Sequence, residues 1–380
     1  MPQNLIVFTE RVLLEEQIKT KVLINADLSR LDVSGLNFSD CTLSNVIFSS
    51  ENNAHKKIVD VSFCNATLHN VFFENCNLSF CNFDQTTRKS DEYSIEKCSF
   101  KKSTLTNCRF RKACISWSDF RYSEINNGTF EDARIDFCDF YRSNFLGVII
   151  FRKSVISNSS LYYAYFNEGA NIRRSNLLND TIIQQDKAKY RKFLADWETH
   201  GPSIRKNDQQ QVSQWNIDTA CKARFADAED IYKNLNGLWM SKGFYSDANW
   251  AYVQGRRMEL RRHIAEFGKQ QLKNKIIHSW KIVTNLFSNI LFGYGESMFR
   301  MVLTYILVIM IFAFLYNGNV SFPTWLDSIW VSLKKMVGVG SESIEGVSPF
   351  VDILNILQTT VGVLLTGIFG FILGNKIRNQ

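Results

Sequence analysis

The sequence lacks the residue patterns of an enzyme or a metalloprotein. It has no phosphate-binding loop and no nucleophile motif, and its nine cysteines include no Cys-x-x-Cys pair. No Cys/His cluster has zinc spacing, because the five histidines are scattered at His55, His69, His200, His263 and His278. We therefore expect no enzymatic activity, no metal and no cofactor.

Long apolar runs are scarce before Met298, since nearly all of them follow it, which explains a mean hydropathy of only -0.14. Near the N-terminus, Glu10, Arg11 and Glu15 stand where a signal peptide would need an apolar core. We therefore expect a cytoplasmic N-terminus and cysteines that are thiols. The net charge is +7, but residues 21–183 carry 19 basic and 18 acidic groups, whereas residues 184–297 carry 18 and 12. This basic excess just before the apolar segments follows the positive-inside rule.

A large apolar residue recurs every five positions across residues 21–183. This period fits neither a helix nor a simple strand, and it requires a backbone that turns every five residues. A narrow solenoid does so, with one large and one small side chain buried per repeat. Side chains elsewhere in the repeat, such as Arg109 and Arg121, are expected to point outward. The large positions are Leu28, Val33, Phe38, Leu43, Phe48, Phe63, Leu68, Phe73, Leu78, Phe83, Phe100, Leu105, Phe110, Ile115, Phe120, Ile125, Phe130, Ile135, Phe140, Phe145, Ile150, Val155, Phe166, Ile172, Leu177 and Ile182.

Six cysteines occupy the small position of the repeat, two residues before a large one. A buried free cysteine behaves as a small hydrophobic residue, so the pattern favours core filling over metal or redox chemistry. These cysteines are Cys41, Cys76, Cys81, Cys98, Cys108 and Cys138.

The repeats resemble the A(D/N)LXX consensus of the pentapeptide-repeat family, for example Ala-Asp-Leu-Ser-Arg at residues 26–30. The resemblance implies a right-handed, quadrilateral β-helix with four repeats per coil over residues 21–183, behind an N-terminal cap at residues 1–20. Residues 51–60 and 86–97 interrupt the pattern and are predicted to be loops. Some family members mimic DNA with a strongly acidic surface. The balanced charge here argues against that role, and we expect no nucleic-acid partner.

Residues 184–264 are predicted to be a helical linker. A polar stretch at residues 201–211 precedes two helices separated at Gly243, which resemble a single TPR-like hairpin. One copy needs a neighbour to pack on, either the solenoid end or another subunit. Residues 265–297 follow as a basic amphipathic helix and connector. This helix is expected to lie on lipid of the inner leaflet, with an ordinary packed helix as the alternative. Its apolar face comprises Leu272, Ile276, Trp280, Val283, Phe287 and Ile290, with Lys273, Lys275 and Lys281 outside it.

The C-terminal region, residues 298–380, contains two apolar segments. Residues 298–316 span roughly 28 Å as a helix, about one hydrocarbon core, and residues 353–375 form a second uncharged stretch. Flanking basic residues predict a multi-pass inner-membrane protein with both ends cytoplasmic. Between them, residues 325–337 form a short helical pattern that ends in Val337-Gly338-Val339-Gly340. A short helix, a glycine pair and a return predict a pore loop.

This layout resembles two-helix potassium-channel-like modules and the bacterial group that fuses them behind pentapeptide repeats. The resemblance implies a homotetramer that conducts monovalent ions. It assigns Met336 with residues 337–340 to the selectivity filter, and it places Gly293-Tyr294-Gly295-Glu296 before the first span. Glycines expected to act as hinge or packing positions in the second span are Gly362, Gly367, Gly370 and Gly374.

The filter departs from the family pattern. Met336 stands where the family has Thr, and Val339 stands where it has Tyr. Lys334 and Lys335 end the pore helix, and Glu342 and Glu345 at the pore mouth are their expected partners. We therefore predict weak discrimination between K⁺ and Na⁺.

Two functions remain open from the sequence. The first is a tetrameric ion channel whose solenoid senses or docks an unknown cytoplasmic protein or ligand, with a role in stress or phage defence through depolarisation. The second is a non-conducting membrane-anchored scaffold that binds proteins through its solenoid.

Overall fold

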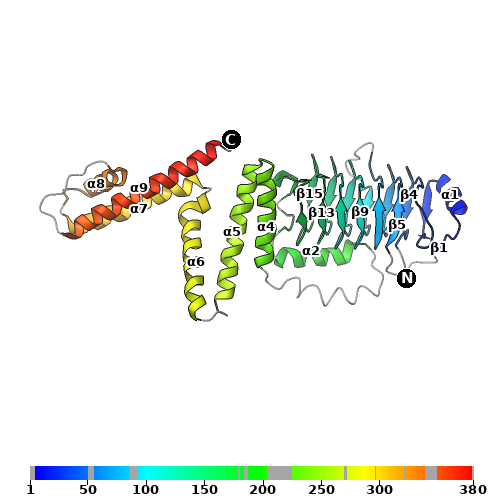
Figure 1. Ribbon diagram of the computed structural model, residues 1–380, viewed down its shortest axis with the longest axis horizontal. Coiled ribbons are helices and arrows are strands. Elements are labelled where there is room, and N and C mark those ends of the chain that lie inside the picture. The colour runs from blue at the N-terminus through cyan, green and yellow to red at the C-terminus, as the bar shows by residue number, and fades with distance from the viewer. Residues whose placement is uncertain are drawn as a thin grey trace. The chain divides into compact units, whose positions relative to one another are not determined.

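The computed structural model describes residues 5–49, 55–85, 93–178, 180–183, 187–202, 225–268, 272–295, 297–320, 322–338 and 349–378 (Figure 1). The chain divides into two compact units, residues 1–258 and residues 259–380. The first unit contains the repeats and the second contains the apolar helices. The predicted loop residues 339–348, with Val339, Gly340, Glu342 and Glu345, lie outside the described residues.

The repeats form a β-solenoid of short parallel strands. In the regular part of the two main sheets, Leu105 pairs with Ile125 and Ile125 with Phe145 in one sheet, and Ile115 pairs with Ile135 in the other. Successive coils there are 20 residues apart, or four repeats. Two further ladders of single bridges run alongside, for example Asp119 to Asp139 and Arg109 to Thr129. The seven-stranded sheet contains β2 (Val22–Ile24), β4 (Thr42–Ser44), β6 (Thr67–His69), β8 (Ile95–Glu96), β10 (Cys114–Ser116), β12 (Arg134–Asp136) and β15 (Val155–Ser157). The six-stranded sheet contains β5 (Lys56–Val59), β7 (Cys76–Ser79), β9 (Thr104–Thr106), β11 (Glu124–Asn126), β13 (Asn144–Leu146) and β16 (Tyr165–Phe166). Two-stranded sheets join β1 (Ile6–Val7) to β3 (Ala26–Asp27) and β14 (Ile149–Ile150) to β17 (Ala170–Asn171).

The turn that the period of five requires is made by the residue two places after each large one. In every repeat from Lys97 to Arg142, this residue has a φ between 48° and 59°. That left-handed conformation is uncommon for residues other than glycine, and Asn and Asp adopt it most readily. Here it also occurs at Trp117 and Phe137, so the coil geometry outweighs local preference.

Two ladders of stacked phenylalanines fill the interior. Phe63, Phe83, Phe110 and Phe130 stack with ring centroids 4.7–5.0 Å apart. The second ladder, Phe73, Phe100, Phe120 and Phe140, stacks at 4.8–5.0 Å. The ladders meet edge to face, an arrangement that aromatic rings favour. The predicted inward register of these eight residues is therefore confirmed.

The small inward positions are filled as predicted by all six cysteines, which are buried and free. Their Sγ atoms lie near backbone carbonyls of the same coil or the preceding one, for example Cys98 to Leu68 at 3.6 Å. Burial raises the pKa of Cys98 to about 12 and also raises that of Cys138. Both thiols are therefore neutral at pH 7 and unreactive as nucleophiles.

The predicted loops are wrong in their second halves. Residues 56–59 form β5 and residues 95–96 form β8. Ile58 and Ile95 are inward and at most 1% exposed, because they continue the period of five backwards from Phe63 and Phe100. The first halves, residues 51–54 and 86–92, lie outside the described residues.

The predicted register is also wrong at Ile150 and Val155. Phe151 and Ile156 point inward instead, and Ile135 pairs with Ile156, 21 residues away. The extra residue enters beside Gly147, whose φ is +65°. At this bulge, the side-chain carbonyl of Asn127 accepts a hydrogen bond from the Val148 N–H at 2.9 Å.

Helices close the solenoid. Leu14 of α1 (Arg11–Lys19) is fully buried in the solenoid core at the N-terminal end. At the other end, after the 3₁₀ helix η1 (Arg174–Asn176), the hairpin of α4 (Phe225–Ser241) and α5 (Tyr245–Phe267) packs on the last coil. The Trp239 indole donates to the Ile172 carbonyl at 2.7 Å, and Arg173 pairs with Asp247 at 2.7 Å. The sequence left two packing partners open for the hairpin, the solenoid end or another subunit. In the structure, the hairpin packs on the solenoid end.

The second unit is helical. It contains α6 (Leu272–Phe292), the 3₁₀ helix η2 (Gly293–Gly295), α7 (Met298–Asn319), α8 (Trp325–Val337) and α9 (Pro349–Arg378), preceded by the last residues of α5. Two of these helices are long and apolar enough to cross a membrane: residues 298–319 have a mean hydropathy of 2.4, and residues 349–374 have 2.0. Both helices extend beyond the predicted spans. α9 begins at Pro349, because proline suits the first turn of a helix, where no N–H donor is needed.

Candidate functional site

The short helix α8 packs against both long apolar helices (Figure 1). The Ser332 hydroxyl donates to the Ile309 carbonyl of α7 at 2.8 Å. The Gln358 side-chain amide of α9 donates to the Ser332 carbonyl at 2.9 Å and to its hydroxyl at 2.6 Å. Ser332 and Gln358 are fully buried. A buried polar cluster therefore joins α8 to both long apolar helices.

The C-terminal turn of α8 lies against the backbone of α9 at Gly362. A Cβ atom at residue 362 would lie 2.2 Å from the Met336 carbonyl oxygen, so only glycine allows this approach. The other glycines of the predicted hinge, Gly367, Gly370 and Gly374, have no atom of the described residues within 4 Å of the same position. Among the four, Gly362 alone is required by the packing of the single chain.

The large side chains of α8 lie in different surroundings. Met336 is 2% exposed and lies with Ser328 and Ser332 against α7 and α9. Trp330 and Val337 are 57% and 67% exposed. The difference follows from side-chain size. The small Ser328 and Ser332 let α8 approach α7 and α9 closely, as small residues do between membrane helices. The large side chains are thereby turned away.

The end of α8 is fixed by Gly338. This residue has a φ of +72°, and its N–H is directed at the Lys334 and Lys335 carbonyls. Glycine commonly ends helices in this conformation because it lacks a Cβ. Lys334 and Lys335 lie in the last turn, where a positive charge complements the helix dipole. The Lys334 ammonium lies 5.5 Å from the Trp330 ring centre, within range of a cation–π contact.

The amphipathic face of α6 is open in the single chain. Ile276, Trp280, Phe287 and Ile290 are 57–70% exposed, although all four are large and apolar. The side chains of Leu272, which belongs to the predicted face, and of Lys273, which does not, lie outside the described residues. At the far end of α6, the Tyr294 hydroxyl donates to the Asn285 side chain at 2.7 Å and ties the connector to the helix.

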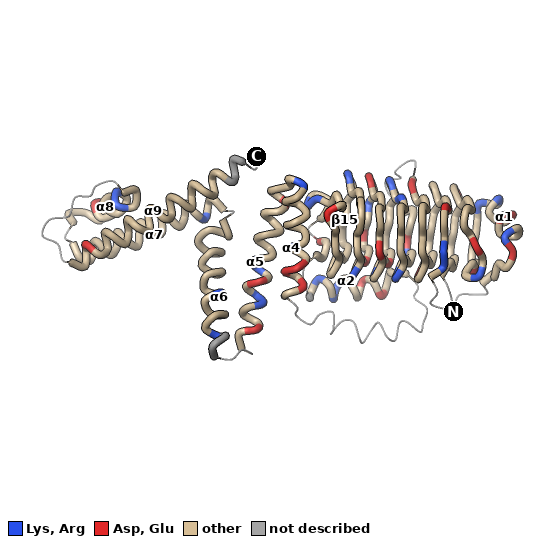
Figure 2. Tube along the Cα trace, viewed as in Figure 1, with Lys and Arg blue, Asp and Glu red and all other residues tan. Residues whose placement is uncertain are grey.

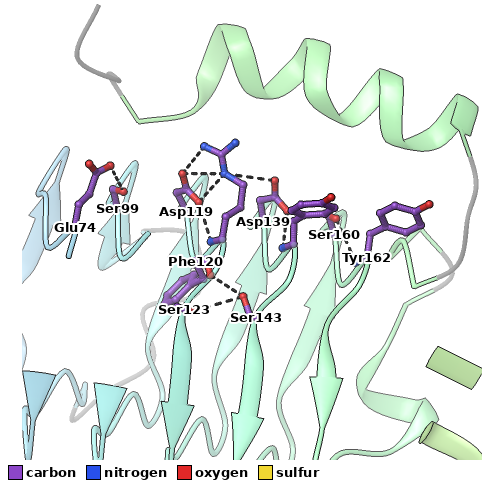
Figure 3. Close-up of polar contacts among 11 residues, drawn as sticks. Glu74, Ser99, Asp119, Phe120, Ser123, Asp139, Ser143, Ser160 and Tyr162 are labelled. Carbon is purple, nitrogen blue, oxygen red and sulfur yellow. Dashed lines mark hydrogen bonds and ion pairs between the residues drawn. The ribbon is translucent and has the colours of Figure 1, made fainter. Parts of the chain in front are cut away.

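The solenoid contains a buried charge cluster that the sequence interpretation missed. Arg121 was expected to be exposed, but it is 5% exposed and pairs with Asp119 at 2.6 Å. Asp139 lies on the next coil, 3.9 Å from the Arg121 guanidinium (Figure 3). The prediction failed because α2 (Lys187–His200) covers this face with Tyr190, Phe193 and Trp197.

Burial dominates the electrostatics of this cluster. It raises the pKa of Asp139 to about 7, although Arg121 opposes the shift. Asp119 and Asp139 raise the pKa of Arg121 against the effect of its burial, so the guanidinium stays charged. Among the described residues, the Asp139 Oδ2 atom has no hydrogen-bond partner.

Comparison with known proteins addresses the repeats. The family model for pentapeptide repeats, eight copies long, matches residues 58–87. This chain contains a pentapeptide-repeat β-solenoid. The described residues of the solenoid form about eight coils. No curated protein matches the chain.

Several solved structures resemble the chain over less than half of its length. A pentapeptide-repeat protein, Rfr23, from the cyanobacterium Cyanothece 51142 is 10% identical and covers 42% of this chain and 95% of its own, with a TM-score of 0.22. HetL from Nostoc sp. strain PCC 7120, a pentapeptide-repeat protein involved in heterocyst differentiation regulation, is 15% identical, covers 43% and 85%, and has a TM-score of 0.21. Full-length QnrB1, a plasmid-mediated fluoroquinolone resistance protein, is 12% identical, covers 46% and 86%, and has a TM-score of 0.21.

Charge on the pentapeptide-repeat solenoid is mixed. Figure 2 shows basic and acidic residues interspersed along its coils. Several form pairs between neighbouring coils, such as Arg111 with Asp84 at 2.7 Å. The described part of the solenoid therefore presents no continuous acidic face of the kind that DNA mimicry needs.

Proposed function

We propose that this protein is a homotetrameric ion channel of the potassium-channel-like type, with its solenoid as a cytoplasmic sensing or docking domain. The observation that carries the proposal is the position of α8, held between α7 and α9 by Ser332 and Gln358. We also propose that the solenoid is the right-handed, four-sided β-helix of its family, which the four parallel ladders support.

The length and the end of α8 support a pore helix. Its 13 residues extend about 20 Å, too short to cross a hydrocarbon core of about 30 Å. The helix ends at Gly338, where the backbone turns away in a left-handed conformation. In a pore loop, backbone beyond such a turn supplies carbonyl oxygens to the permeant ion. Because a single loop cannot surround an ion, four chains would share one pore.

The surfaces of the second unit support an assembly in lipid. Only 22% of each apolar segment is buried inside the single chain. Lipid and neighbouring subunits would cover the rest of both segments. They would also cover the exposed Trp330 and Val337 of α8. α6 would lie on the inner leaflet, with its exposed Ile276 and Trp280 in the membrane interface and its basic residues toward lipid head groups. We therefore propose that the protein lies in the inner membrane with both ends in the cytoplasm.

The filter region supports weak selectivity among monovalent ions. Met336 is buried against Gly362 and offers no hydroxyl, so one ring of oxygen ligands is missing. Lys334 and Lys335 offset the attraction of the helix dipole for cations. The channel needs no cofactor beyond the permeant ions, and we propose no enzymatic activity. Depolarisation in response to stress or phage infection is the physiological role that fits such a pore.

An ion-flux assay tests the proposal. Purified full-length protein is reconstituted into vesicles loaded with KCl, and K⁺ efflux is followed with Gly362→Val and Gly367→Val as a matched pair. Efflux should be rapid for the unmodified protein and for Gly367→Val, and slow for Gly362→Val, which displaces the α8 backbone. A folded, membrane-inserted protein without efflux would instead favour the non-conducting scaffold.

A further inference from the structure

Three side chains from two different helices, α5 and α6, lie close together in the second unit. His263 and Glu266 are three residues apart on α5, so they share a helix face. His278 comes from α6 and faces them. One ligand atom from each of the three residues lies within 4.8 Å of the other two. The two imidazole rings are 5.0 Å apart, with their planes at 81°.

Within the described part of the chain, three ring nitrogens of these histidines are buried without a hydrogen-bond partner. His263 is 3% exposed, and neither of its ring nitrogens has a hydrogen-bond partner among the described residues. The Nδ1 atom of His278 is likewise buried without one. The Glu259 carboxylate is 3.7 Å from the His263 Nε2 atom, too far for a hydrogen bond. Buried polar atoms are normally paired, so three unpaired imidazole nitrogens in one place point to a missing ligand.

The electrostatics favour the neutral ring. Burial lowers the pKa of His263, and Arg262 and Lys281 add to this effect, while Glu259 opposes it. A neutral imidazole has a free lone pair, which is the form that binds metals. A bound cation is thus compatible with the protonation state of the site.

We propose that His263, Glu266 and His278 bind one divalent transition-metal ion, and that Zn²⁺ is the best match. Two imidazoles and a carboxylate suit zinc, whereas Mg²⁺ and Ca²⁺ prefer oxygen ligands alone. Zinc bonds of about 2.0–2.1 Å place tetrahedral ligand atoms roughly 3.3 Å apart. Binding therefore requires side-chain rotations that bring the three groups from within 4.8 Å to that spacing. Water or Glu259, one helical turn before His263, completes the tetrahedron.

The place of the site in the chain suggests its role. It fastens the end of α5 to α6, and α6 leads through η2 directly into α7. An ion here stiffens the covalent connection between the helical hairpin and the first apolar helix. This consequence rests on the proposed channel function, since metal occupancy would then regulate the pore. Metal binding itself does not depend on that function.

Metal binding is tested on the full-length protein in detergent after chelation. Zn²⁺ is titrated by calorimetry, and Co²⁺ serves as a visible-absorption probe of ligand geometry. We expect one ion per chain and a tetrahedral cobalt spectrum. Removing a ligand should cost at least as much affinity as removing an outer-shell partner, about 10–100-fold. His278→Gln, Glu266→Gln and His263→Gln should all show this loss, whereas the exposed His55→Gln serves as the matched control and should bind normally.

The outcomes separate the two proposals. Unchanged affinity in His278→Gln and Glu266→Gln, whose side chains are partly exposed and tolerate substitution, would overturn the metal site. So would the absence of stoichiometric binding to the unmodified protein. Efflux from vesicles that changes with Zn²⁺ in the unmodified protein but not in His278→Gln supports regulation. One ion per chain without any efflux upholds the metal site and contradicts only the channel.

Discussion

The side-chain amide of Gln358 donates hydrogen bonds to both the carbonyl and the hydroxyl of Ser332, at 2.9 and 2.6 Å. The two residues lie on α9 and α8, and both are fully buried. Since Ser332 also donates to α7, its hydroxyl is the point where all three helices meet. Polar contacts of this kind hold membrane helices together where the hydrophobic effect cannot.

Replacing Gln358 tests this cluster. Gln358→Leu removes both donated bonds and should lower the free energy of unfolding by about 1–3 kcal/mol, the cost of buried polar groups left unpaired. Thermal unfolding in detergent provides the measurement. Thr360→Val is the control, because the Thr360 side chain is exposed and its hydroxyl donates within its own helix, to the Ile356 carbonyl. Similar losses in both variants would show that Gln358 has no special role.

Gly362 and Gly367 form a second matched pair on α9. Gly362→Ala places a methyl group against the Met336 carbonyl, so α8 must move or α9 must bend. Gly367→Ala meets no atom of the described residues. We expect a lower melting temperature only for Gly362→Ala, together with faster proteolysis between α8 and α9. A normal melt for Gly362→Ala would contradict the close packing of these two helices.

Alanine variants of Arg121 and Arg109 compare a buried with an exposed charge on the solenoid. Arg121→Ala leaves Asp119 and Asp139 as buried carboxylates without their cation, which typically costs about 3–5 kcal/mol. The side chain of Arg109 is 50% exposed and lies 3.5 Å from Asp84, so Arg109→Ala should cost about 0–1 kcal/mol. Denaturant unfolding of the full-length protein measures the loss of unfolding free energy in each variant. Equal effects would mean that α2 does not cover this face in solution.

The raised pKa of Asp139 predicts that the stability of the folded protein depends on pH. Its pKa is raised to about 7 in the folded protein, above its usual value near 4, so between these values only the folded state holds the proton. Its contribution to stability is therefore complete below about pH 4 and is lost as the pH rises to about 7. Asp139→Asn, which cannot ionise, should gain stability relative to the unmodified protein between pH 5 and pH 8. Thermal melts at pH 5 and pH 8 measure the stability difference between Asp139→Asn and the unmodified protein, with Asp180→Asn at an exposed site as control. A stability difference that stays constant across this range would contradict the raised pKa.

The repeats were predictable because a period of five constrains every coil. The predicted inward positions shifted near Gly147, where the adjacent pairs Ile149-Ile150 and Val155-Ile156 offer an apolar residue in either frame. The buried Arg121 could not be anticipated, since its cover comes from a helix beyond the last repeat. His263 and His278 escaped notice for a similar reason: they come from two different helices, α5 and α6, and their spacing of 15 residues matches no ligand motif.

Currents across a planar bilayer test the central claim most directly. Purified full-length protein should produce unitary currents whose reversal potential shows little preference for K⁺ over Na⁺. Lys334→Gln with Lys335→Gln should shift that potential toward cation preference under a KCl gradient, which ties the current to the end of α8. The absence of unitary currents from correctly inserted protein would contradict the channel. Sharp K⁺ selectivity in the unmodified protein would contradict the weak filter.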